Sequence, residues 1–482
     1  MGFKFVFLWT DVALYALFIT LLVYVWHVRR TPSLQANWKK VMHDPAALSA
    51  GVLLLLFGSV TALDSVHFRR ALTPAAGGTA QVYYDTRTTS LLDVVLARQI
   101  EMRETTYSAP LAFVGISKES VEVGGKTVRE YPRLKFGGAH LRDPAKEWAS
   151  DIGGRTTFGL LCGGLVFVGL LFATAVVLRR AHGGIGQALR DIATDNTHYP
   201  LRATAATLLV VCLLGGVVVA LMGHYHVFGT DRTGNSVLYQ ALKSVRTAFV
   251  IGSLATLATL PLAVALGILA GYFKGWVDEV IQYLYTLLSS VPNVLLIAAC
   301  VLMVQVFLDK NPEMFETGAE RSDLKVLLLC IVLGVTGWAT LCRLVRGETL
   351  KLRELDYVQA ATAFGVSDTR IMVRHILPNV MHLVLITTVL GFSELILYEA
   401  VLTYVGVGVD PGTSSFGGMI NLARSEMNRE PTVWWSFAAA FGFMVTLVLA
   451  ANLFADGVRD AFDPRARSFR PRLIKAKHHA AG

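Results

Sequence analysis

The chain has 482 residues, of which 54% are hydrophobic and 16% are charged. Soluble domains carry about 25% charged residues, so this composition excludes an ordinary soluble protein and indicates one that crosses a membrane several times. The formal net charge of +9 fits Lys and Arg gathered on one side of a membrane. No aromatic stacking motif accompanies the basic residues, so nucleic acid is not an expected partner. The five cysteines lie inside apolar runs without metal-binding spacing, and neither a metal site nor a bound cofactor is predicted.

A transmembrane helix needs roughly 20 mainly apolar residues. About nine segments meet this requirement, which predicts an all-α polytopic membrane protein. The first segment is too long for the core of a signal peptide and lacks a small-residue cleavage site, so it is predicted to be a span. The segments are 5–28, 46–63, 157–178, 200–222, 245–273, 280–307, 325–345, 380–403 and 433–455.

The distribution of Lys and Arg predicts which side each loop occupies. Most of these residues in the shorter connections fall in alternate loops and in the C-terminal segment, which includes the basic tail 467–482. Cytoplasmic loops carry this excess. With an odd number of spans, we expect the N-terminus outside and the C-terminus in the cytoplasm of a bacterial inner membrane. The predicted cytoplasmic segments are 29–45, 179–199, 274–279, 343–379 and 456–482.

The long polar segment 64–156 is predicted to be a small α+β extracytoplasmic domain. Its stretch SVEVGGKTVREY alternates around Gly124 and Gly125, a hairpin pattern. In SLLDVVLARQIEMRE, Ser90 is a candidate N-cap with Asp93 three residues later, which predicts an amphipathic helix. The segment contains no cluster of His, Cys and carboxylates. We therefore expect it to pack or dock rather than to catalyse.

A polar stretch, DYVQAATAFGVSDTRIMVRHILPN, separates two apolar runs at residues 356–379. Its first part favours a helix that ends at Gly365, because glycine tolerates the left-handed cap conformation. Ser367 is a candidate cap for a second helix, and Pro378 is expected to end that helix before the next span. Ala360 and Ala361 are expected to give the first helix a flat face on which a partner protein can approach closely.

This stretch resembles the signature loop of ABC importer permeases, which reads Glu-Ala-Ala, three residues, Gly, nine residues, Ile, one residue, Leu-Pro. Gln359 stands at the usual Glu position, and His375 stands at the Ile position with Ile376 next to it. The resemblance implies that residues 354–378 dock on an ATPase subunit and couple its closure to the spans. The implied coupling residues are Gln359, Ala360, Ala361, Gly365, His375, Ile376, Leu377 and Pro378.

Six further motifs resemble the dipeptide/oligopeptide permease subfamily: HVFGTDRTGNSV, GYFKGWVDE, SVPNVLL, RLVRGE, YEAVLTYVGVGV and DGVRDAFDPR. They extend over residues 226–466 and imply a type I-like ABC permease core. Asn235 and Ser236 depart from the usual Arg-Asp. Either 37–58 or 200–222 could be the family's first span. The expected divisions are N-terminal spans 1–63, the insertion domain 64–156, additional spans 157–225, the core 226–466 and the tail 467–482.

The resemblance implies a non-catalytic permease subunit of an ATP-driven importer for peptides or similar small solutes. No ATP-binding motif occurs in the sequence, so ATP and Mg²⁺ are expected on one or two partner ABC ATPase subunits. A second, homologous permease would complete the pathway, and an extracytoplasmic solute-binding protein would deliver the solute. The sequence does not identify that solute.

Two carboxylates, Glu394 and Glu399, fall in the apolar run 380–403. A carboxylate at membrane depth is costly unless it faces water or a partner. Glu394 is predicted either to line the translocation path, where it could meet a peptide's amino terminus, or to pack between helices. Glu399 is a second candidate, for which a structural role fits better. The alternative function is an ion-coupled secondary transporter or channel that uses Glu394, but the internal repeat typical of such proteins is not evident.

Overall fold

The computed structural model describes residues 3–71, 84–123, 126–182, 184–315 and 317–462. Within these ranges the chain is mainly helical, and nine helices are long and apolar enough to cross a membrane. This agrees with the predicted all-α polytopic fold. The chain forms two compact units. Unit 1 comprises residues 1–25, 56–103 and 235–452, and unit 2 comprises residues 26–55, 104–234 and 453–482.

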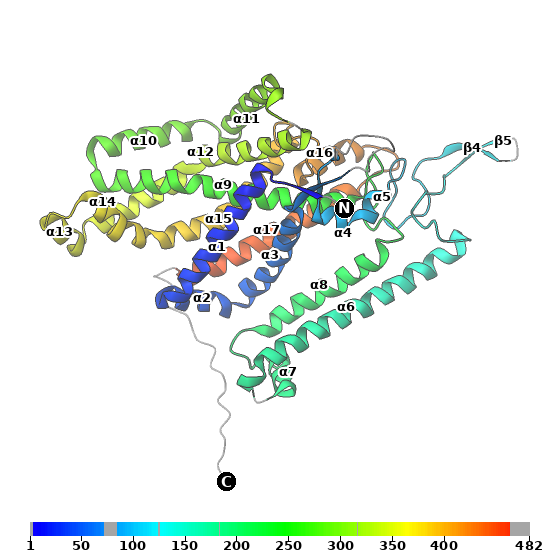
Figure 1. Cartoon of the computed structure of the whole chain (residues 1–482), viewed down its shortest axis with the longest axis horizontal. Helices are drawn as coiled ribbons and strands as arrows, with labels where there is room; N and C mark the ends of the chain where they lie inside the picture. The colour runs from blue at the N-terminus through cyan, green and yellow to red at the C-terminus, as the bar shows by residue number, and fades with distance from the viewer. Residues whose placement is uncertain (1–2, 72–83, 124–125, 183, 316, 463–482) are drawn as a thin grey trace, which may run out of the picture. The chain divides into compact units, whose positions relative to one another are not determined.

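Unit 1 contains a small antiparallel sheet and the long helices of the predicted core (Figure 1). Its elements are β1 (Phe3–Val6), most of α1 (Trp9–Arg30), the end of α3 (Pro45–Asp64), β2 (His67–Arg70), β3 (Thr89–Ser90), α4 (Leu91–Val95), α5 (Ala97–Glu101), α9 (Val237–Phe273), α10 (Gly275–Ser290), α11 (Asn293–Lys310), the 3₁₀ turn η1 (Pro312–Met314), α12 (Gly318–Arg353), α13 (Asp356–Ala363), α14 (Asp368–Ile371), the π-helical turn η2 (Met372–Ile376), α15 (Leu377–Tyr404), α16 (Phe416–Glu426) and most of α17 (Trp435–Phe462).

Unit 2 is built around two long helices that pack together, α6 and α8. It also holds the predicted hairpin, in which β4 and β5 pair antiparallel with Val121 opposite Val128. The hairpin prediction is therefore confirmed, although its turn at Gly124 and Gly125 lies outside the described residues. The elements are the end of α1, α2 (Pro32–His43), most of α3, β4 (Glu119–Val123), β5 (Lys126–Glu130), α6 (Pro144–His182), α7 (Ile185–Ala193), α8 (Leu201–Leu221) and the end of α17.

Helices α9 and α12 lie side by side and form the centre of unit 1 (Figure 1). Glycines allow this close approach, as is common between membrane helices. A Cβ on Gly334 would lie 2.4 Å from the Ala258 Cβ, and one on Gly267 would lie 2.8 Å from the Val345 Cβ. With 37 and 36 residues, both helices are roughly 55 Å long at 1.5 Å per residue. They are longer than a hydrocarbon core of about 30 Å, so their ends extend beyond it.

The predicted span 280–307 is wrong as a single helix. The chain divides there into α10 and α11, with a break at Val291 and Pro292. Pro292 has no N–H to donate, and the residue before a proline is pushed into extended backbone. Val291 accordingly has φ −91° and ψ 135°. Only the second piece, Asn293–Lys310, qualifies as a span.

The predicted insertion domain 64–156 is not confirmed as one folded unit. Residues 64–103 belong to unit 1 and residues 104–156 to unit 2. The last part of the segment is helical, because α6 begins at Pro144. The capping box of Ser90 and Asp93 is confirmed. However, the helix it starts is two short helices separated at Leu96, rather than one amphipathic helix.

A buried ion-pair network in unit 1 fixes the first span to the core. The Arg246 guanidinium of α9 lies 2.6 Å from the Asp11 carboxylate of α1. The Asp11 carboxylate also lies 2.7 Å from the His67 ring of β2. Asp323 of α12 accepts a hydrogen bond of 2.9 Å from the Thr10 backbone N–H. Buried charges require such partners, so α1 is a packed part of unit 1. The sequence pattern did not indicate these pairs, because the partners lie far apart in the chain.

Candidate functional site

The polar loop after α12 begins with α13, which ends in a Schellman turn around Gly365. The Gly365 N–H donates to the Thr362 carbonyl (3.0 Å), and the Val366 N–H donates to the Ala361 carbonyl (3.1 Å). Gly365 has φ +72°, a conformation that glycine adopts without strain. A Cβ at this position would meet nothing within 4 Å. A larger residue would therefore be disfavoured by the backbone conformation and not by a clash. The predicted helix end at Gly365 is confirmed.

The second half of the loop differs from its prediction. Ser367 occupies the N-cap position of α14, but its side chain makes no capping hydrogen bond. The predicted break at Pro378 is wrong, because α14, η2 and α15 follow one another without interruption. Pro378 stands in the first turn of α15, where the missing N–H is tolerated. The loop's second helix is thus continuous with the next span, and a movement of the loop would act directly on α15.

Three apolar side chains anchor the loop to unit 1. Val358, Ile371 and Ile376 are at most 1% exposed. They belong to a cluster that includes Trp338 and Val345 of α12. Full burial of such a side chain contributes about 2 kcal/mol. The loop is therefore held as part of the folded core and does not hang free outside it.

The opposite side of α13 faces away from the core. Gln359 and Ala360 are exposed, and Phe364 is 88% exposed. Ala361 is instead half-buried and packs against the apolar cluster. The prediction that the two alanines form one flat outer face is therefore wrong. The outer face presents Gln359, Ala360 and the Phe364 ring.

The end of the loop signature is partly buried. Leu377 packs against the apolar cluster, whereas Pro378 is exposed. The His375 ring lies 6.0 Å from the Tyr357 ring. The Asn379 amide donates to the His375 carbonyl over 2.6 Å and to the Tyr357 hydroxyl over 3.2 Å. These contacts join the start of α13 to the start of α15.

Polar contacts tie both halves of the loop to the end of α9. The Tyr272 hydroxyl donates to the Asp368 carboxylate (2.7 Å), and the Arg353 guanidinium donates to the Tyr272 carbonyl (2.6 Å). The Lys274 ammonium lies 2.8 Å from the exposed Glu354 carboxylate and lowers its pKa. A cavity of about 510 Å³ opens here, lined by Tyr272, Phe273, Arg353, Glu354, Gln359, Thr362, Ala363 and Asp368.

Two of the sequence motifs meet beside the loop. Arg346 of RLVRGE donates to both carboxylate oxygens of Asp278 in GYFKGWVDE, over 2.5 and 2.7 Å. Hydrogen bonds from Arg346 hold the pKa of Asp278 below its usual range, although partial burial opposes this shift. Both motifs were recognised in the sequence, but the pairing was not, since 68 residues separate the partners.

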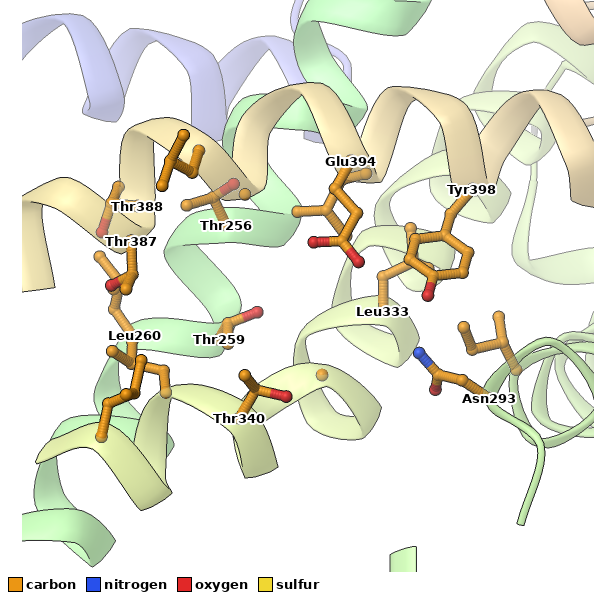
Figure 2. A pocket seen from close by; sticks show the side chains of 17 residues that line it. Thr256, Thr259, Leu260, Asn293, Leu333, Thr340, Thr387, Thr388, Glu394 and Tyr398 are labelled. Atoms are coloured by element: carbon orange, nitrogen blue, oxygen red, sulfur yellow. The ribbon is translucent and has the colours of Figure 1, made fainter. Parts of the chain in front are cut away.

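A second cavity, of about 340 Å³, lies among the membrane helices of unit 1. Figure 2 shows the Glu394 and Tyr398 side chains extending into it from α15. Residues of α9, α11 and α12 complete the wall. The polar side chains in the lining are Thr256, Thr259, Asn293, Thr340, Thr387, Thr388, Glu394 and Tyr398.

Glu399 does not line this cavity. Its side chain is buried, at 1% exposure, and its carboxylate accepts a hydrogen bond of 2.8 Å from the Thr403 hydroxyl one turn later. The structure therefore brings only Glu394, of the two predicted carboxylates, to a place that a solute could occupy. Glu399 is a packing carboxylate.

Comparisons with known proteins identify the family. A family model described as binding-protein-dependent transport system inner membrane component matches residues 263–468. The oligopeptide transport system permease protein OppC of Mycobacterium tuberculosis H37Rv is 32% identical over 248 residues, which cover 52% of this chain and 79% of that protein. The chain belongs to this family.

Two other relatives match a similar length of this permease. The dipeptide transport system permease protein DppC of Lactococcus lactis is 32% identical over 243 residues, 50% of this chain and 64% of that protein. The glutathione transport system permease protein GsiD of Pectobacterium atrosepticum is 31% identical over 243 residues, 50% of this chain and 74% of that protein. All three match about half of this chain.

Family membership confirms the resemblance read from the sequence. The protein is a multi-pass inner membrane permease of a binding-protein-dependent ABC importer, and it is a non-catalytic subunit. ATP hydrolysis belongs to partner subunits. The alternative of an ion-coupled transporter that works alone is therefore set aside.

Proposed function

We propose that this permease forms half of a translocation pathway for peptides or similar small solutes. The cavity around Glu394 carries this proposal, because it places a carboxylate and several hydroxyl groups in a space among the membrane helices of the family core. The names of the relatives support the substrate class, since they transport oligopeptides, dipeptides or glutathione. A second, homologous permease supplies the other half of the path, and an extracytoplasmic solute-binding protein delivers the solute.

The loop 354–378 is proposed to be the docking site for an ABC ATPase subunit. Its outer face is exposed around Phe364, while Val358 and Ile371 hold its inner face in the core. The uninterrupted path from α14 into α15 supports a mechanical role. ATPase closure would move α13 and α14 together, and α15 would carry that movement to Glu394. Gln359 carries no charge, so the docking contact at this position is proposed to depend on shape rather than on a salt bridge.

The proposed orientation places the N-terminus outside and the C-terminus in the cytoplasm. The loop 343–379 then faces the ATPases, as the coupling proposal requires. The proposed core, residues 226–466, overlaps the segment 263–468 that the family model matches. Residues 1–63 and 157–225 carry the other spans, with either 37–58 or 200–222 as the family's first span, and 64–156 is the extracytoplasmic insertion. The basic tail 467–482, proposed to be cytoplasmic, lies outside the described residues.

Affinity purification of the tagged chain in mild detergent tests the assembly. The expected result is recovery of a second permease of the same family with one or two ABC ATPases, identified by mass spectrometry. The same complex in liposomes, supplied with its binding protein, should accumulate tri-alanine only when ATP is present. A chain that purifies alone and transports under an ion gradient would contradict the proposal.

A further inference from the structure

Four of the five threonines that line the Glu394 cavity donate their hydroxyl protons within their own helices. Thr256 donates to the Gly252 carbonyl over 2.6 Å. Thr387 donates to the Leu383 carbonyl over 2.9 Å. Thr259 and Thr388 make the same contact with the carbonyl four residues earlier, over 2.9 and 2.6 Å. A hydroxyl has one proton and two lone pairs, so these four oxygens can offer only acceptor capacity to the cavity.

The described residues that line the cavity also carry a negative charge and no positive charge. Among the described residues that line it, Glu394 is the carboxylate, and none of the lining side chains is Lys, Arg or His. Asn293 and Tyr398 add donor groups, but no positive charge. No described cation forms an ion pair with Glu394 in this chain, whereas the buried carboxylates Asp11 and Asp323 of unit 1 both pair with Arg246.

A carboxylate at membrane depth needs a partner of opposite charge or water. Among the described residues, the wall around Glu394 contains no cationic side chain and holds several hydrogen-bond acceptors. We propose that Glu394 and the threonine oxygens form a subsite for the ammonium group of the transported solute, so that solutes with a free amino terminus are favoured. This rests on the proposed function of the cavity as a translocation path.

The size of the cavity suits one end of such a solute. Its volume of about 340 Å³ lies at the small end of the range for ligand sites, about 300–1,000 Å³. An amino terminus with its first side chain fits this space, while the rest of a peptide would extend toward the second permease. The apolar wall at Leu260, Leu333 and Leu395 can accept side chains without selecting among them.

A cysteine-protection experiment tests the subsite without the binding protein, whose own preference would obscure it. Leu390→Cys places a thiol on the cavity wall, and the chain from residue 343 onward contains no native cysteine. Alkylation at position 390 of the purified complex is then measured by mass spectrometry, with tri-alanine or N-acetyl-tri-alanine as the protecting solute.

We expect tri-alanine to protect the thiol at concentrations at least roughly tenfold lower than its acetylated form, because charge-assisted hydrogen bonds are stronger than neutral ones. Glu394→Gln should abolish this difference, and Glu394→Asp should keep most of it. Thr387→Val, which removes one acceptor at nearly constant shape, should reduce it only about two- to threefold.

Equal protection by both peptides in the unsubstituted cavity would overturn the ammonium subsite. An unchanged difference in Glu394→Gln would also overturn it. If the second permease supplies the counter-charge to Glu394, equal protection is the outcome. Failure of the proposed function is distinguishable, since neither peptide would then protect and ATP-driven uptake of tri-alanine would be absent.

Discussion

The loop 354–378 and the Glu394 cavity belong to the same unit but are built in opposite ways. The loop is fixed by apolar anchors such as Val358 and Ile371, and it presents an uncharged residue, Gln359, where the family usually has Glu. The cavity combines apolar with polar side chains and presents a carboxylate, with residues drawn from four different helices. We infer that the loop transmits a shape change, whereas the cavity responds to the charge of a solute.

This difference predicts separable defects. Changes in the loop should uncouple ATP hydrolysis from uptake without altering which solutes protect the cavity. Changes in the cavity should alter solute preference and leave coupling intact. The loop and the cavity share one scaffold, the packing of α9 on α12. This packing should be needed both for coupling and for solute preference.

The largest effect is expected from Gly334→Leu, which should damage both the loop and the Glu394 cavity. A Cβ at this position already lies 2.4 Å from the Ala258 Cβ, so helices α9 and α12 must separate. Overpacking of this kind costs about 3 kcal/mol. We expect little folded protein, measured by size-exclusion chromatography in detergent. Gly347→Leu, on the same helix with open space around its Cβ, is the control and should remain folded.

An intermediate effect is expected from Asp278→Asn at the Arg346 pair. The folded-state pKa of Asp278 is lowered, so its stabilisation is present above the unfolded pKa of about 3.9 and is lost as pH falls through the lower folded value. The variant should lose about 2 kcal/mol at pH 7, the size of a hydrogen bond to a charged group. Its thermal midpoint should also fall less than that of the unsubstituted protein between pH 5 and pH 3. Parallel pH profiles for the two proteins would contradict the pairing.

The smallest effect on stability is expected from Phe364→Ala, which separates a role of the loop in ATPase binding from a role in folding. This side chain is 88% exposed, so its removal should change the free energy of unfolding by less than about 0.5 kcal/mol. We expect a marked loss of ATPase binding nonetheless, because exposed aromatic residues often carry interface energy. Co-purification of the ATPase measures this. Val358→Ala, on the buried side of the same helix, should instead destabilise the permease.

The sequence predicted the loop better than the cavity for a physical reason. Gly365 and the residues it caps are neighbours in the chain, so local backbone preferences were sufficient. The end of the loop was mispredicted because the break usual at a proline did not occur at Pro378, which stands in a first helical turn. The inward position of Ala361 depends on packing against distant helices, and no local pattern reveals that.

The cavity required the tertiary structure. Glu394 was recognisable as a carboxylate in an apolar run, but Glu399 carried the same local signal and proved to be buried against Thr403. Thr256 and Thr340 line the same cavity as Glu394 only because α9, α12 and α15 pack together. The pairs of Asp278 with Arg346 and of Asp11 with Arg246 were missed for the same reason, since opposite charges far apart in sequence give no periodic signal.

The most direct test of the central claim compares Gly365→Val with the unsubstituted permease in the assembled, reconstituted transporter. Valine at φ +72° is strained, whereas its Cβ would meet nothing within 4 Å. ATP hydrolysis and tri-alanine uptake are measured in the same liposomes. The account predicts that the complex assembles and hydrolyses ATP, but that uptake falls at least roughly tenfold, as coupling requires the geometry of this turn. Undiminished ATP-driven uptake by Gly365→Val would contradict the assignment of this loop as the coupling element.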